Sequence, residues 1–128
     1  MADWIWVDVG VAIAAHAEQL AEHGGAAGTR DPNMLESAMA RPLNLVAYGD
    51  PDAADLAAAY AFGIARNHPF VDGNKRTAAV VSETFLMLNG YQIICDDVEL
   101  VSTFLLLAAG ELTVEVLTDW FRANIART

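Results

Sequence analysis

Nine consecutive residues, His68 to Arg76 (HPFVDGNKR), bring together side chains that could bind and move a phosphate group. The pattern from Asn74 onward predicts a helix, so Gly73 stands at a helix N-terminus, where the first N–H groups lack internal partners and the helix dipole is positive. Such N-termini bind phosphate oxygens. Lys75 and Arg76 add positive charge, and arginine can hold phosphate oxygens through two parallel hydrogen bonds. The segment therefore predicts an anion-binding site.

Two other residues of this segment could act on the bound phosphate. Asp72 supplies a carboxylate, and proteins commonly hold Mg²⁺ with one or two carboxylates together with phosphate oxygens and water. Histidine is the commonest general base in enzymes, so His68 could take a proton from an incoming hydroxyl group. Asn74 could cap the helix or brace the loop, and Phe70 is expected to anchor the loop in the core. Together these residues favour transfer of a phosphate-containing group from a nucleotide.

Each of these residues also has an ordinary structural interpretation when it is taken alone. A single histidine before proline, such as His68, is usually a loop or core residue, and Asp72 could simply cap the following helix. Lys75 and Arg76 could form a solvated first turn, although positive charge there opposes the helix dipole and suggests that an anion is expected. The segment is not a P-loop, because its lysine is not followed directly by serine or threonine and the upstream glycine is missing.

The loop is expected to lie between two helices. A start signal at Asp50–Pro51 opens a long alanine-rich helix that runs to about Asn67. The residue before a proline is steered away from the helical conformation, so the chain leaves this helix at His68. After the loop, an apolar helical pattern covers Asn74–Leu88 and ends at Asn89–Gly90, and we expect it to be the buried central helix.

The remaining helices are predicted from capping residues, from proline in a first turn and from glycine at helix ends. They run from Asp8 to about His23, from Asn33 to Ala40, from Asp96–Asp97 to about Ala109, and from Thr113 to the C-terminus. We expect Arg41–Pro42 to stop the second of these, Leu43–Gly49 to be irregular and Tyr91–Cys95 to be an extended connector. Six helices with short connections predict an all-α protein, a compact six-helix bundle.

Length and composition indicate a single domain over residues 1–128. Hydrophobic residues make up 55% of the chain, which is enough for one packed core. The formal net charge of -10, from 7 basic and 17 acidic side chains, argues against nucleic acid and anionic membranes as partners, because both would repel the chain at long range. The expected partners are therefore proteins and small ligands. Lys75, the only lysine, lies in the loop that could bind phosphate.

We expect a cytoplasmic protein. Cys95 is the only cysteine, so no internal disulfide can form, and nothing near it has the spacing of a zinc site. Asp3 and Asp8 stand where a signal peptide needs basic residues, so no export signal is expected. The most apolar later stretch, Val101–Ala109, is far shorter than the roughly 20 residues that span a bilayer.

The run HPFVDGNKRTA, from His68 to Ala78, resembles the signature of the Fic/Doc superfamily. Fic members carry HPFxxGNGR, and members of the Doc (death-on-curing) branch carry an NKRTA ending. The similarity extends through GTRDPNMLESAMARP, from Gly28 to Pro42, and through NGY, from Asn89 to Tyr91. The chain is identified as a member of this superfamily, and its size suits the Doc branch, which implies a Fic/Doc-like helical bundle.

The resemblance implies a role for each residue of the loop. His68 would be the general base that acts on a hydroxyl of a target protein, and Asp72 would hold Mg²⁺ on the nucleotide. An anion hole would be formed by Gly73, Asn74, Lys75 and Arg76. ATP would be the nucleotide substrate.

Family resemblance also bears on which group is transferred. Fic enzymes usually transfer AMP, whereas the founding Doc toxin is kinase-like: it binds ATP in the reversed sense and phosphorylates a threonine of translation elongation factor Tu, which arrests protein synthesis. Lys75 replaces the glycine of the Fic pattern, and Ala79 replaces a second arginine; both departures favour the Doc-like reaction. Pro69 and Gly73 match the Fic form, so transfer of AMP stays open as an alternative.

Regulation by a separate antitoxin follows from the same resemblance. Many Fic proteins restrain themselves with a motif of Ser/Thr, three residues, Glu and then Gly/Asn, and this chain has no Ser or Thr followed by Glu four positions later. An antitoxin of the Phd type would instead fold its disordered C-terminal segment along the toxin. Trp4, Trp6 and Leu43–Tyr48 are candidates for the groove, although core packing is the favoured role for most of them. A further alternative is a catalytically silent helical binding module.

Several other polar residues are expected to lie on the surface. His16 and His23 are interpreted as surface polar groups of the first helix. Arg30, Glu36 and Arg41 fall in the family-like segment before the loop, where they could border the docking site of the target, but helix-surface charge is the simpler interpretation.

Overall fold

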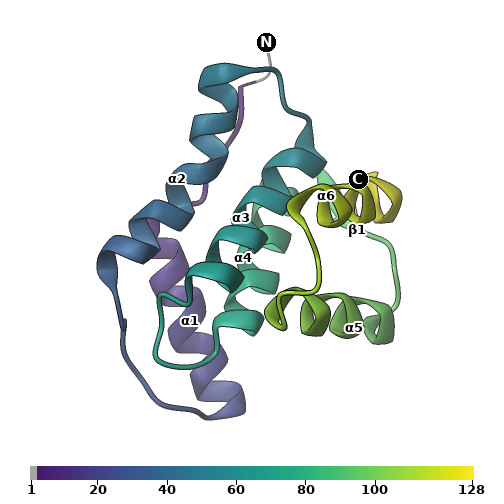
Figure 1. Ribbon diagram of the computed structural model, residues 1–128. Helices are drawn as coiled ribbons and strands as arrows, with labels where there is room; N and C mark the ends of the chain where they lie inside the picture. The colour runs from purple at the N-terminus through teal and green to yellow at the C-terminus, as the bar shows by residue number, and fades with distance from the viewer. Residues whose placement is uncertain (1–2) are drawn as a thin grey trace.

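The computed structural model describes residues 3–128, which form six α-helices and one small sheet (Figure 1). In chain order the elements are α1 (Val9–His23), α2 (Pro32–Tyr48), α3 (Ala53–Asn67), α4 (Asn74–Leu88), β1 (Tyr91–Ile93), α5 (Asp97–Ala108), α6 (Val114–Asn124) and β2 (Ile125–Arg127). The six-helix prediction is confirmed, with two short strands added. None of these helices is long and apolar enough to cross a membrane.

Polar side chains begin the helices largely as predicted. The side chains that accept hydrogen bonds from N–H groups of a first turn include Asp8, Asp31, Asp96 and Thr113. The start of α3 lies slightly beyond the predicted Asp50–Pro51, because Asp52 and Asp55 form a reciprocal capping box in which each side chain accepts the other's main-chain N–H at 2.9 Å. Local capping chemistry therefore sets most helix starts.

The second helix is longer than predicted. The expectations that Arg41–Pro42 ends it and that Leu43–Gly49 is irregular are wrong, because α2 continues through Pro42 to Tyr48. Proline inside a helix removes one N–H and crowds the preceding turn. Here that cost is offset by burial, since four residues at helical spacing form one buried stripe that packs on α3: Leu35, Ala38, Met39 and Pro42.

The two helices that flank the loop form the centre of the molecule (Figure 1). α4 lies in the core as expected, with Phe85 and Leu86 fully buried. α3 is buried over an even larger part of its length and packs against α2, α4 and α6. At Gly63 of α3, an added Cβ atom would lie only 3.0 Å from the Arg41 Cδ and 3.1 Å from the Ala38 Cα. The close approach of α2 therefore depends on the absence of a side chain at this position.

The N-terminal segment packs against this core. The rings of Trp4 and Trp6 lie 5.9 Å and 6.0 Å from the Phe85 ring. The buried Tyr60 hydroxyl accepts a hydrogen bond from the Val7 N–H at 3.0 Å. Both tryptophans are partly buried, so the favoured interpretation of them as core residues is confirmed.

The C-terminus differs from the prediction. The last helix does not reach the end of the chain, because α6 stops at Asn124 and Ile125–Arg127 forms β2. β2 pairs antiparallel with β1, with Tyr91 opposite Arg127 and Ile93 opposite Ile125. Since the partner strand lies more than 30 residues away in the sequence, no local pattern of three residues reveals the pair. The fold is thus helical with a small two-stranded sheet.

An ion-pair cluster joins α6 to the N-terminus of α3. The Arg122 guanidinium donates to both carboxylate oxygens of Asp52, at 2.9 Å and 3.1 Å, and lies within 3.4 Å of Asp55. Burial tends to raise the pKa of the Asp52 carboxyl group. Hydrogen bonds from Arg122 and from the Asp55 N–H outweigh that effect and lower the pKa of Asp52 to about 2. The cluster therefore stabilises the fold most when Asp52 is ionised.

Replacing Arg122 by glutamine is expected to lower the free energy of unfolding at pH 7 by up to about 1 kcal/mol, since both side chains of the pair are about half exposed. The pKa of Asp52 is lowered in the folded state, so its stabilisation is complete above the unfolded pKa near 4 and is lost as the pH falls towards about 2. Urea denaturation of both proteins between pH 7 and pH 2 measures this. Arg127→Gln removes an arginine that forms no ion pair within residues 3–128, so its difference should not change with pH. A difference for Arg122→Gln that stays constant down to pH 2 would contradict the prediction.

Candidate active site

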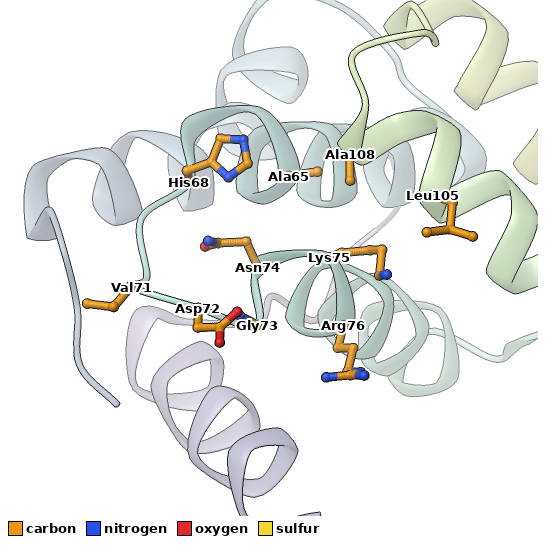
Figure 2. A pocket seen from close by; sticks show the side chains of 10 residues that line it. All are labelled: Ala65, His68, Val71, Asp72, Gly73, Asn74, Lys75, Arg76, Leu105 and Ala108. Atoms are coloured by element: carbon orange, nitrogen blue, oxygen red, sulfur yellow. The ribbon is translucent and has the colours of Figure 1, made fainter. Parts of the chain in front are cut away.

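The predicted site residues line one cavity of about 370 Å³ between the loop, the first turn of α4 and α5 (Figure 2). Its walls are Ala65, His68, Val71, Asp72, Gly73, Asn74, Lys75, Arg76, Leu105 and Ala108. Every residue that the sequence singled out for catalysis or anion binding is therefore at this cavity. The contribution of α5 is not visible in the sequence, because Leu105 and Ala108 are ordinary residues of an apolar helix.

His68 ends α3 in an unusual main-chain conformation. It has φ 48° and ψ 55°, and it is the only residue other than glycine with a positive φ among residues 3–128. Such a left-handed conformation is costly for most side chains and recurs at functional sites. The His68 N–H donates to the Ile64 carbonyl at 3.2 Å, which closes the helix. The side chain is exposed to the cavity, so it is accessible to a hydroxyl group (Figure 2).

Arg30 holds the main chain of the loop from outside. Its guanidinium donates to the His68 carbonyl at 2.8 Å and to the Asn67 carbonyl at 3.0 Å. Its main-chain N–H and that of Asp31 both donate to the Pro69 carbonyl. The expectation of a simple surface charge is therefore wrong for Arg30. Only the fold brings it to the loop, since the two segments are 38 residues apart.

Asn74 and Phe70 fix the interior of the loop. The Asn74 side chain accepts from the Phe70 N–H at 2.9 Å and donates to the Phe70 carbonyl at 3.0 Å, so it braces the loop and does not cap the helix. Phe70 is 1% exposed, which confirms the expected hydrophobic anchor. Because the Asn74 amide is used in this way, its contribution to anion binding would come from the main chain.

The N-terminus of α4 presents main-chain donors to the cavity. The Thr77 N–H donates to the Gly73 carbonyl at 3.0 Å, and in the described part of the chain the N–H groups of the preceding residues Asn74, Lys75 and Arg76 have no hydrogen-bond partner. The Gly73 N–H, in contrast, donates to the Asp72 Oδ1 at 2.8 Å. Three of the four predicted anion-hole residues therefore offer a free N–H group.

The Asp72 carboxylate is exposed, and it is the only acidic side chain that lines the cavity. Its second oxygen, Oδ2, accepts weakly from the Ala26 N–H at 3.4 Å. Within residues 3–128 no group of three histidine, cysteine, aspartate or glutamate side chains could enclose a metal ion. One carboxylate beside a phosphate site suits Mg²⁺, which is usually held by few protein oxygens together with phosphate oxygens and water. The donor set therefore fits a metal that arrives with a nucleotide.

His16 is the second residue, after Arg30, whose role the sequence interpretation missed. It is not a surface group, because it is only 4% exposed and its ring stacks on the Phe70 ring at 3.9 Å with an interplanar angle of 6°. Its Nε2 lies 2.8 Å from the Asp72 carbonyl oxygen. A carbonyl can only accept, so Nε2 must carry a hydrogen. The helical spacing from the buried Ala12 is the one sequence signal that places His16 on the inner face of α1.

Comparison with known proteins identifies the family of this chain. The model of the Fic/DOC family matches residues 6–86, which include the whole HPFVDGNKR loop. The chain is 36% identical over 111 residues to "Protein kinase doc" of Escherichia phage P1, which covers 86% of this chain and 87% of that protein. It is 47% identical over 75 residues to "Toxin Doc" of Mycolicibacterium smegmatis, which covers 57% of this chain and 58% of that protein. Since the family model and the phage relative each span more than half of the chain, this protein belongs to the Fic/DOC family.

Proposed function

We propose that this protein is a toxin that transfers the terminal phosphate of ATP to a hydroxyl group of a target protein. The observation that carries the proposal is the meeting, in one cavity, of an exposed histidine, a carboxylate and a helix N-terminus with free N–H groups and two positive side chains. Its relatives are named as a protein kinase and as a toxin. Elongation factor Tu is the target that we propose, with arrest of translation in the cytoplasm as the result.

The proposed reaction divides its work among the residues of the loop. The target hydroxyl oxygen forms a bond to the terminal phosphorus of ATP, the bond from that phosphorus to the ADP oxygen breaks, and His68 takes the hydroxyl proton. The free N–H groups at the start of α4, with Lys75 and Arg76, stabilise the charge on the transferred phosphate. Mg²⁺, when held by Asp72 and the phosphates, would neutralise part of the same charge.

Lys75 supports transfer of a phosphate over transfer of AMP. A glycine at this position would leave room for an α-phosphate and its leaving pyrophosphate, whereas the lysine side chain occupies that room. Lys75 is half-buried at the cavity wall, on the side where Leu105 and Ala108 of α5 close it (Figure 2). A cation held there favours the terminal phosphate. AMP transfer remains the second candidate, because Pro69 and Gly73 match the Fic form of the loop.

Separate labelling of ATP at its α and γ positions tests the proposal. The protein, Mg²⁺, labelled ATP and a bacterial lysate are incubated together, and the labelled protein is isolated for intact-mass measurement. The expected result is label from the γ position only and a mass gain of one phosphate on elongation factor Tu. A mass gain of an AMP group would overturn the kinase reaction, and absence of any labelled protein would favour the silent binding module.

We also propose a Phd-like antitoxin as a partner. A cavity of about 260 Å³ lies between the N-terminal segment and α2, and it is lined by Trp6, Val7, Asp8, Val9, Glu36, Met39, Ala40 and Leu43. Leu43 of this cavity is exposed, and two more exposed apolar side chains near the end of α2, Leu45 and Tyr48, line a separate cavity. An amphipathic helix fits such a surface. Growth arrest by the chain alone, relieved by co-expression of its antitoxin, is the expected result; harmless expression of the chain without a partner would contradict it.

Because His16 holds the Asp72 carbonyl, we expect its replacement to slow phosphate transfer. His16→Phe keeps a flat ring against Phe70 but loses the hydrogen bond to the Asp72 carbonyl, whereas His16→Gln can keep the donor and loses the ring. Because a displacement of about 1 Å can cost about 10²-fold in rate, we expect a loss of about 10- to 100-fold for His16→Phe and a smaller loss for His16→Gln. Single-turnover transfer rates, with thermal melting as the stability control, measure this. Equal rates for His16→Phe and the natural protein would refute the role of the hydrogen bond.

A further inference from the structure

Positive side chains without a carboxylate partner gather near the end of α3. Among residues 3–128, Arg122 is the only lysine or arginine that forms an ion pair, although the chain has 17 acidic side chains and 7 basic ones. Arg30 is used to hold the loop, and Lys75 and Arg76 line the candidate phosphate cavity. Of the other three, Arg127 lies on β2 over the Tyr91 ring, and Arg41 of α2 and Arg66 of α3 meet at Phe62.

These two arginines share one aromatic ring. The guanidinium carbon of Arg41, from α2, lies 5.3 Å from the centroid of the Phe62 ring, and that of Arg66, from α3, lies 5.2 Å from the same centroid. Neither guanidinium donates a hydrogen bond to any residue of the described chain. We call Arg41, Phe62 and Arg66 the arginine–phenylalanine cluster.

The cluster is held in place before any partner binds. Each guanidinium is attracted to the negative face of the ring, and the stem of Arg41 lies across α3 at Gly63, where an added Cβ atom would come within 3.0 Å of its Cδ. Two like charges on one ring repel each other, and no carboxylate of the described chain neutralises them. A bound anion would remove that repulsion, and preorganised guanidinium groups lose little freedom when they bind a carboxylate.

The cluster lies near the C-terminal end of α3, on a different face of the helix from His68 and Ala65, which line the cavity. Arg66 is in the last turn of α3, two residues before His68, which corresponds to about 3 Å along the helix axis and about 200° around it, so a target segment must pass around the end of α3 to contact both. α2 and α3 lie side by side, so Arg41 joins this surface from the neighbouring helix (Figure 1). An extended segment of a target advances about 3.3 Å per residue. Acidic residues a few positions away from the accepting hydroxyl could therefore reach the cluster.

We infer that the arginine–phenylalanine cluster is a docking surface for an acidic segment of the target protein. The inference rests on the proposed function, since it concerns how the same site selects its protein substrate. A polypeptide is favoured over nucleic acid, because the net charge of -10 would repel a polyanion at long range while a short acidic segment can contact two local cations.

The test compares a double variant, Arg41→Gln with Arg66→Gln, with the matched control Arg127→Gln. The control removes an arginine that also lies over an aromatic ring, 4.9 Å from the centroid of Tyr91, but on β2. Transfer of phosphate to the target isolated by lysate labelling is measured at several salt concentrations, together with ATP binding and thermal melting. The double variant should lose about tenfold or more in kcat/KM through a higher KM, with unchanged ATP affinity. The control should stay within about twofold of the natural protein.

The dependence of kcat/KM on salt concentration and a third variant, Phe62→Leu, test the docking surface further. The natural protein should lose kcat/KM as salt rises, and the double variant should lose much of that dependence. Phe62→Leu keeps apolar volume but removes the ring, so it should give an intermediate loss. If the double variant has an unchanged KM, or loses binding to a nucleic acid probe instead, the docking surface is refuted while the proposed phosphate transfer still stands. If the natural protein labels no target at all, the proposed function fails and the docking surface fails with it.

Discussion

Replacing His68 by alanine is expected to lower the rate of phosphate transfer by about 10²- to 10⁴-fold, which is the usual contribution of a general base. Without the imidazole, no side chain of the cavity other than Asp72 could accept the hydroxyl proton, and Asp72 is expected to be occupied by the metal. The rate is measured as transfer of label from γ-labelled ATP to the target under single-turnover conditions. Toxicity alone is too coarse a measure, because a partly active toxin can still arrest growth.

The main-chain conformation of His68 calls for a second variant. Its φ of 48° is tolerated better by asparagine than by most residues, so His68→Asn should fold at least as stably as His68→Ala. Both variants should bind ATP like the natural protein and both should be slow. Equal transfer by His68→Asn and the natural protein would show that the imidazole is not the base. If the natural protein is stable but both variants are unfolded, the loss of transfer rate reflects loss of the fold.

Replacing Lys75 by alanine is expected to lower the transfer of the terminal phosphate by about 10²- to 10³-fold, the usual cost of removing one group that stabilises transition-state charge. Alanine is a strong helix former, so α4 should begin as before. Lys75→Arg is the matched control, because it keeps the positive charge at the cavity wall and should recover part of the rate. Single-turnover kinetics with γ-labelled and α-labelled ATP measure both reactions at once.

The product distinguishes the two transfer reactions. If Lys75 excludes the geometry needed for AMP transfer, Lys75→Gly should lose phosphate transfer and could gain a trace of AMP transfer, detected as a different mass on the target. Natural-like phosphate transfer by Lys75→Ala would refute the role of the lysine. The main-chain N–H groups of α4 would then be sufficient to stabilise the transferred phosphate.

Helix starts and the chemistry of the loop were predictable because both are local. A capping side chain lies within three residues of the N–H group that it accepts from, as Asp8 and Asp96 do. The loop and the N-terminus of α4 are consecutive in the sequence, so their proximity needs no knowledge of the fold. For the same reason Asp72 and Lys75 could be assigned to one cavity in advance.

Local sequence preference predicts the wrong structure where a distant segment competes with it. Pro42 should stop a helix by itself, but burial of the stripe that it shares with Leu35 against α3 keeps α2 helical. Three residues at the C-terminus form a strand only because Tyr91–Ile93 offers its hydrogen-bonding groups. Neither outcome is visible in the residues nearby.

The sequence by itself determined that this chain has helices, where most of them begin, and that His68 to Arg76 carries the chemistry, since each depends on contacts within a few residues. Only the tertiary structure decided what holds that chemistry in place. Arg30 and His16 reach the loop from 38 and 56 residues away, and they fix the main chain of His68 and Asp72 through carbonyl groups. Every residue has such a carbonyl, so no side-chain pattern in the loop could reveal these contacts.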